Sequence, residues 1–172
     1  MSAVPDGRWK LDAARSSLSF SVRHMGLARV RGSFGEFEGV LELTGGHGSA
    51  RGSVRVESVE TGDRLRDRMI VGGDFFDAPT HPTIEFHAES ADPAGGGSGV
   101  EIPGELTIAG QTRPLQLALG ASVSADALKL TGACKLRRSD FGLRFRGAMA
   151  AGDRTVGDEV SVELELLLVR AG

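Results

Sequence analysis

The chain has 172 residues, with 20 Lys and Arg against 23 Asp and Glu and a formal net charge of −3 at pH 7. This length fits one domain with a full-sized hydrophobic core, so we expect a single domain over residues 1–172 with its core at about 9–169. The small negative charge is not typical of proteins whose main partner is nucleic acid or an anionic membrane.

Residues 1–9 hold no basic segment followed by an apolar run, which predicts no secretory signal and a cytoplasmic location. No stretch approaches the roughly 18 apolar residues of a membrane-spanning helix, so we expect no stable membrane insertion. Cys134 is alone, which excludes an intrachain disulfide and a cysteine-based zinc site. Its place in an alternating apolar run predicts a small buried hydrophobic residue.

Apolar and polar residues alternate along most of the chain, which is the pattern of half-buried strands. We predict about eight strands, over residues 18–22, 37–43, 54–56, 84–86, 100–108, 115–119, 128–136 and 160–168. Glycine-rich clusters at 44–48, 93–99 and 109–112 are typical of hairpin connections. A closed antiparallel barrel is favoured over a sandwich, because closure removes the exposed edges of these long strands.

Residues 61–70 break the alternation and carry many charges. Leu65 and Met69 are four residues apart and therefore share one face of a helix. Asp63 or Thr61 is suited to cap the start of this helix, and the glycines that follow it are suited to end it. We predict a short amphipathic helix here.

A helix this short is not stable alone, so its apolar face must rest on other apolar surface. We therefore expect residues 63–79 to cap one mouth of the barrel. Three arginines of the helix and a histidine at the end of the first strand are the candidates for a polar rim that meets a ligand head group: Arg64, Arg66, Arg68 and His24. The alternatives are an ordinary surface crossover whose arginines are only solvated and, for His24, a structural hydrogen bond.

Strand parity and the predicted cap define a set of candidate ligand-binding residues. They are Phe20, Val22, Phe37, Leu41, Val54, Val56, Leu65, Met69, Phe75, Phe76, Ile84, Phe86, Leu106, Ile108, Leu117, Leu130, Phe141 and Leu164. Small eight-stranded barrels are either filled by side chains or hold one ligand, and periodicity does not choose between these.

Candidates for catalysis are few. The four histidines form no H-x-x-x-H or H-E-x-x-H pair, and the chain has no G-x-S-x-G elbow and no C-x-x-C pair. The glycine-rich run at 95–99 has no helix pattern after it, which argues against a phosphate-binding loop. We predict no catalytic residue, no metal ligand and no cofactor.

A series of motifs in one order covers nearly the whole chain, at 9–12, 17–26, 30–34, 37–39, 61–62, 66–67, 74–77, 81–86, 104–115, 140–143 and 156–160. These motifs resemble those of the YceI-like family of lipid-binding proteins. The resemblance implies an all-β fold, an extended eight-stranded antiparallel lipocalin-like β-barrel with one short helix. It also implies an elongated apolar pore that holds a polyisoprenoid, an isoprenoid quinone or another long apolar lipid, and a possible homodimer.

Three hypotheses follow. The first is a non-catalytic protein that carries or sequesters such a lipid. The second is an enzyme that acts on an isoprenoid lipid or a small metabolite, which requires ionisable groups converging in the pore. The third is a stress-associated module with a packed interior and no ligand.

Overall fold

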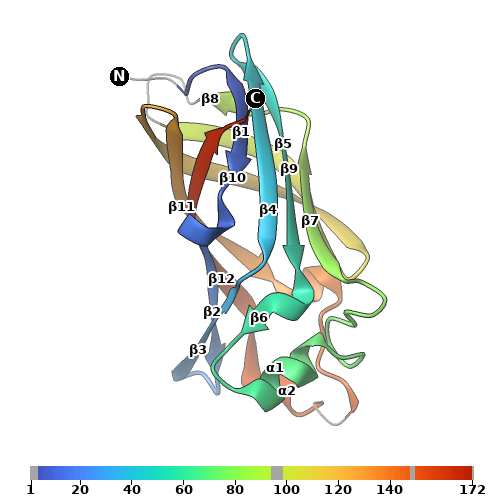
Figure 1. Cartoon of the computed structure of the whole chain (residues 1–172). Coiled ribbons are helices and arrows are strands. Elements are labelled where there is room, and N and C mark those ends of the chain that lie inside the picture. The colour runs from blue at the N-terminus through green and yellow to red at the C-terminus, as the bar shows by residue number, and fades with distance from the viewer. Residues whose placement is uncertain (1–3, 94–98, 148–149, 172) are drawn as a thin grey trace.

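The computed structural model describes residues 4–93, 99–147 and 150–171 and consists mostly of antiparallel strands (Figure 1). The strands are β1 (Gly7–Leu11), β2 (Ser17–His24), β3 (Ala28–Phe34), β4 (Phe37–Thr44), β5 (His47–Arg55), β6 (Val59–Glu60), β7 (Thr83–Ala88), β8 (Asp92–Pro93), β9 (Gly99–Ile108), β10 (Gln111–Ser124), β11 (Ala127–Arg137) and β12 (Val156–Arg170). The helices are α1 (Arg64–Val71) and the short α2 (Gly152–Thr155), with 3-10 turns at Ala13–Arg15, Val56–Ser58 and Arg138–Phe141.

Eight strands close into a barrel. The order β1-β4-β5-β7-β9-β10-β11-β12 is continuous, and β12 pairs with β1 again through Trp9–Arg170, Lys10–Val169 and Leu11–Leu168. The predicted closed antiparallel barrel is therefore confirmed. β2 and β3 continue beyond this ring as a hairpin, because β12 is long enough to pair with β1 at one end and with β2 at the other.

The alternation of the sequence missed β1, β3 and the two-residue strands β6 and β8. β1 is short and offers only Trp9 and Leu11 as a pattern. In β3 the alternation is interrupted by Gly32, whose position is covered by the Phe20 ring of the neighbouring strand. A glycine that leaves space for an aromatic ring on the neighbouring strand therefore interrupted the apolar–polar alternation, and the strand was not predicted.

The predicted third strand was placed too late in the chain. β5 begins at His47 and ends at Arg55, and Val56 opens a 3-10 turn instead of continuing the strand. The hairpin turn before β5 is tight, with positive φ at both Gly45 and Gly46. Of the predicted glycine-rich connection at 93–99, residues 94–98 lie outside the described residues.

The helix prediction is confirmed. The Asp63 carboxylate accepts hydrogen bonds from the backbone N–H groups of Leu65 and Arg66 at 3.0 and 3.1 Å, and Gly72 ends the helix. Such a cap satisfies backbone donors that have no partner inside the helix. None of the described helices is long and apolar enough to cross a membrane.

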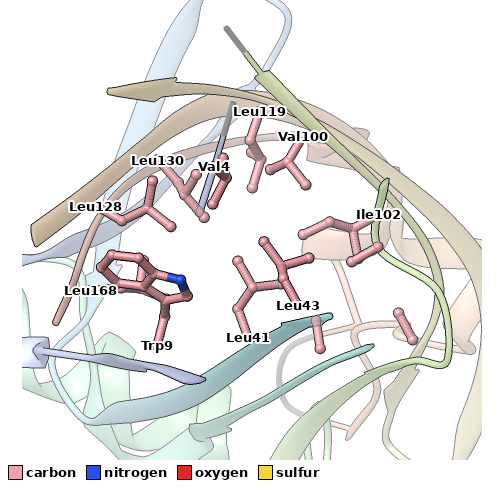
Figure 2. Packing of buried hydrophobic residues seen from close by; sticks show 13 residues of the cluster. Val4, Trp9, Leu41, Leu43, Val100, Ile102, Leu119, Leu128, Leu130 and Leu168 are labelled. Atoms are coloured by element: carbon pink, nitrogen blue, oxygen red, sulfur yellow. The ribbon is translucent and has the colours of Figure 1, made fainter. Parts of the chain in front are cut away.

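The end of the barrel that holds both chain termini is tightly packed (Figure 2). Trp9 is 0% exposed, and Leu128 and Val100 are also fully buried in the same cluster. The Trp9 indole N–H donates to the Pro5 carbonyl, and the Arg170 guanidinium lies 4.6 Å from the centre of the indole ring. A second cluster, around Phe76, Leu106 and Phe141, lies against the α1 segment.

Candidate functional site

Below the packed end, the barrel encloses a cavity of about 780 Å³. Volumes of roughly 300–1,000 Å³ are typical of pockets for small organic ligands. On β12 the lining extends from Val156 to Leu168, a run that spans roughly 40 Å in an extended strand. The cavity is therefore elongated along the barrel.

Aliphatic and phenyl side chains make up most of the lining, because every strand of the barrel turns its apolar parity inward. Ionisable residues also contribute to it, namely His24, Glu38, Arg51, Asp63, Arg66, Arg137 and Arg138. All candidate residues from the sequence contribute to it except Val56. That residue is buried in the second cluster instead, because the 3-10 turn at Val56–Ser58 takes it off the strand face. Side chains outside the candidate set also line the cavity, including Leu11, Val162 and Cys134.

Cys134 is half-buried and faces the cavity next to its cross-strand partner Val162. Burial raises the pKa of this thiol above its usual range. The environment disfavours the thiolate, which is the reactive form, and Cys134 therefore behaves as part of the apolar wall.

At the end remote from the termini, the cavity reaches α1. Leu65 and Met69 line it there, although Leu65 remains 63% exposed, so the lining continues to the surface at this point. Phe75 packs edge-on against Phe76 and stacks on Phe145, with ring centres 4.9 and 4.5 Å apart.

Of the predicted rim residues, His24 and Arg66 line the cavity, whereas Arg64 and Arg68 do not. Arg64 and Arg68 lie on the exposed face of α1, because the helix turns Leu65 and Met69 toward the cavity. The Arg66 guanidinium donates to the Oγ1 and the carbonyl oxygen of Thr61, both at 2.8 Å. Arg66 is thus held by the chain that leads into the helix.

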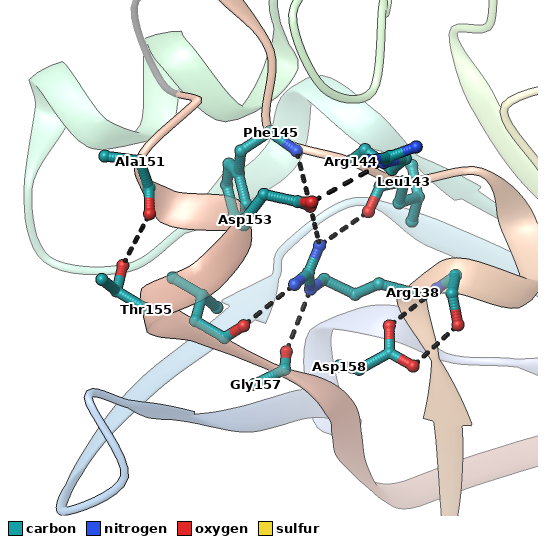
Figure 3. Close-up of polar contacts among 11 residues, drawn as sticks. Arg138, Leu143, Arg144, Phe145, Ala151, Asp153, Thr155, Gly157 and Asp158 are labelled. Atoms are coloured by element: carbon teal, nitrogen blue, oxygen red, sulfur yellow. Dashed lines mark hydrogen bonds and ion pairs between the residues drawn. The ribbon is translucent and has the colours of Figure 1, made fainter.

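Sequence reasoning missed Arg138, which is 7% exposed and the one buried charged residue among those described. Its guanidinium donates to the carbonyl oxygens of Leu143, Val156 and Gly157 at 2.7, 2.9 and 3.0 Å (Figure 3). It also contacts the Asp153 carboxylate at 3.4 Å. No periodic pattern marks this arginine, since it follows directly after β11.

A break in the β12–β2 ladder explains why these carbonyl groups need Arg138. The pairing shifts between Val156 and Val160, which is the signature of a β-bulge. Gly157 lies within the bulge, and Val156, the last residue in register with β2 before it, lies beyond the end of the β11–β12 pairing at Arg137–Glu159. Their carbonyl groups accept from Arg138 instead, since a buried polar group without a partner is costly. Asp158, within the bulge, accepts hydrogen bonds from the backbone and side chain of Ser139.

This network changes the pKa of two of its carboxylates, Asp153 and Asp158. Partial burial raises the pKa of Asp153, but hydrogen bonds from Arg138 and the Phe145 backbone outweigh this effect, so the pKa is lowered overall. The pKa of Asp158 is lowered in the same way, with the hydrogen bonds from Ser139 outweighing burial. Within the described residues, no three His, Cys, Asp or Glu side chains come together as a metal site.

This combination of a closed eight-stranded barrel and a long apolar cavity matches known proteins. The model of the YceI-like domain matches residues 9–168 of the chain. The chain belongs to the YceI-like family. A UPF0312 protein of Vibrio cholerae is 28% identical over 149 residues, covering 81% of this chain and 78% of its relative. A UPF0312 protein of Staphylococcus aureus is 28% identical over 162 residues, covering 88% and 91%.

Two solved structures share the fold of this YceI-like chain. Burkholderia cenocepacia BcnA has a TM-score of 0.80 and 26% identity, with 91% of this chain and 98% of that chain covered. A polyisoprenoid binding domain from Saccharophagus degradans, implicated in plant cell wall breakdown, has a TM-score of 0.75 and 16% identity, with 95% and 98% covered. At 16% identity, the second likeness concerns the fold alone.

Proposed function

We propose that this YceI-like protein is a non-catalytic carrier or sequestering protein that holds an elongated apolar molecule in the barrel cavity. The observation that carries the proposal is the cavity itself, about 780 Å³ with a wall mostly of aliphatic and phenyl side chains. A packed interior without a ligand does not agree with a cavity of this size. The polyisoprenoid-binding domain that shares the fold supports a polyisoprenoid or isoprenoid quinone as the ligand.

The energetics of such a ligand are favourable without any bond being broken. Each CH₂ group transferred from water to the cavity contributes about 0.8 kcal/mol, so a few isoprene units already provide useful affinity. Ordering and association costs limit the total, and non-covalent affinities saturate near about −20 kcal/mol. A long chain therefore needs only partial burial, with its head group near His24 and Arg66 at the α1 end.

The direct test is organic extraction of the purified protein followed by mass spectrometry. The matched variants are Val162→Trp and Glu163→Trp. Val162 faces the cavity between its strand partners Cys134 and Phe20, whereas its neighbour Glu163 is exposed on the outer face. Both changes add the same indole, but only Val162→Trp fills the cavity.

We expect a long apolar lipid from the wild type and from Glu163→Trp, and about tenfold less from a folded Val162→Trp protein, as for a loss of 1.4 kcal/mol or more. Added geranylgeraniol should bind the emptied wild type with the same ranking of variants. If no lipid is extracted and geranylgeraniol does not bind, or if Val162→Trp binds as well as wild type, the proposed function is wrong.

A further inference from the structure

The exposed large hydrophobic residues of the described chain all lie on two segments. Met25 (69% exposed) and Leu27 (96%) form the tip of the β2–β3 hairpin, and Leu65 and Met69 lie on α1. Figure 1 shows the hairpin tip and α1 at the same end of the barrel, away from both termini. The cavity also reaches this end, since it is lined by His24 beside the tip and by Leu65 and Met69.

The geometry of the turn does not account for the presence of large apolar residues at the hairpin tip. Met25 and Gly26 both have positive φ, 55° and 76°, like the two central residues of a type I′ turn, within a three-residue loop between the paired residues His24 and Ala28. Such turns favour Asn, Asp or Gly at both positions, and a bulky side chain in the left-handed region is a local cost. Exposed apolar side chains that gather at one end of a molecule, as these do with Leu65 and Met69, mark a contact with another apolar phase.

The charge around the tip indicates what that phase is. Residues 17–34, from the start of β2 to the end of β3, contain three arginines and no Asp or Glu, although the whole chain has a net charge of −3. Arg23, Arg29 and Arg31 are exposed on the outer face of the hairpin. Arg23 and Arg29 are direct cross-strand partners, and like charges placed opposite one another destabilise a sheet. An anionic surface would offset this repulsion.

The exposed face of α1 continues the same pattern. Arg64 and Arg68 are exposed beside Leu65 and Met69, and neither arginine forms an ion pair with any described carboxylate. The acidic groups of the segment are engaged within the protein. Asp63 caps the helix, and Asp67 accepts hydrogen bonds from the backbone and hydroxyl of Thr61.

We infer that this end of the barrel docks on the surface of an anionic phospholipid bilayer, with Met25 and Leu27 inserted among the head groups and the arginines of the hairpin and α1 against the phosphates. Basic residues attract anionic lipid over a Debye length, and apolar side chains add the free energy of their burial. The docked cavity end would face the bilayer. The docking itself does not depend on the proposed function. Exchange of the apolar ligand between the docked protein and the membrane, by contrast, rests on the proposed function.

The test is flotation of the protein with vesicles of phosphatidylcholine alone and of phosphatidylcholine mixed with phosphatidylglycerol. We expect the wild type to float with the anionic vesicles and to be released as salt shortens the Debye length toward about 3 Å at 1 M. Met25→Asn/Leu27→Ser should lower the bound fraction about tenfold, and Arg23→Glu/Arg31→Glu should do so by tenfold or more.

A charge-matched control separates the hairpin from net charge. Lys10→Glu/Lys129→Glu makes the same change in net charge at two exposed strand positions near the packed end, and it should float like the wild type. Val162→Trp, which fills the cavity, should also float like the wild type. Flotation therefore succeeds or fails independently of lipid extraction.

Three results would overturn the docking inference. One is equal binding of the wild type to neutral and anionic vesicles. Another is unchanged flotation of both hairpin variants. The third is a wild type that does not float but sediments as a dimer, with the hairpin variants monomeric, in which case the surface contacts a second copy of this chain.

Discussion

Replacement of Arg138 by Met would remove the guanidinium and keep most of the aliphatic stem. Three carbonyl oxygens at 2.7–3.0 Å would lose this donor, and the Asp153 carboxylate would lose its contact at 3.4 Å but keep the Phe145 backbone N–H. Each buried acceptor left without a partner costs about 1–3 kcal/mol. Because Val156 and Gly157 are only partly buried, we expect a total at the lower end of the sum for three acceptors, about 3–5 kcal/mol. This is a large part of the roughly 5–15 kcal/mol that stabilises a domain.

The assay is urea unfolding followed by the fluorescence of Trp9, the single tryptophan, which lies in the packed cluster at the other end. The matched control is Arg144→Met. Arg144 contacts the same Asp153 carboxylate at 3.6 Å, but its side chain is 69% exposed, so the loss should stay below about 1 kcal/mol. Equal, small losses in both variants would show that water satisfies the carbonyl groups and would refute this role of Arg138.

Three further predictions concern acid stability, packing and access to the cavity. Because the pKa of Asp153 is lowered in the folded state, its stabilising effect is present above its unfolded pKa of about 3.9 and is lost as pH falls through the folded value. Asp153→Asn should therefore flatten the acid limb of a plot of unfolding free energy against pH, and an unchanged limb would contradict the assignment. A Cβ added at Gly104 would lie 2.7 Å from a backbone carbonyl oxygen, whereas one at Gly73 would meet nothing within 4 Å. Gly104→Ala should cost about 1–3 kcal/mol in urea unfolding and Gly73→Ala should cost less, with the reverse order counting against the packing argument. Replacing Leu65 and Met69 with Ser should speed the exchange of a bound fluorescent apolar probe while leaving the far-ultraviolet circular dichroism intact, and unchanged exchange in the folded variant would argue against a cap.

Strand identity and inward parity were readable from the sequence in most of the long strands, although β3 was missed and β5 was placed too late. The parity that predicts Phe20, Ile84 and Leu164 as inward-facing holds in the structure, because side chains alternate strictly between the two faces of a strand. The α1 helix was also predictable, since its start depends on Asp63 and its end on glycine, both local signals. Val56 was misplaced, because the end of a strand is set by its neighbours and not by its own pattern.

Whether the barrel interior is filled or hollow was decided by the tertiary structure alone. Aliphatic residues of the same types pack around Trp9 at one end and surround a cavity of about 780 Å³ toward α1. The difference depends on strand tilt and spacing, which the periodicity of the sequence does not predict. The role of Arg138 was also decided by the tertiary structure. Its acceptors come from Leu143 and from the bulge at Val156 and Gly157, which only the folded chain brings together.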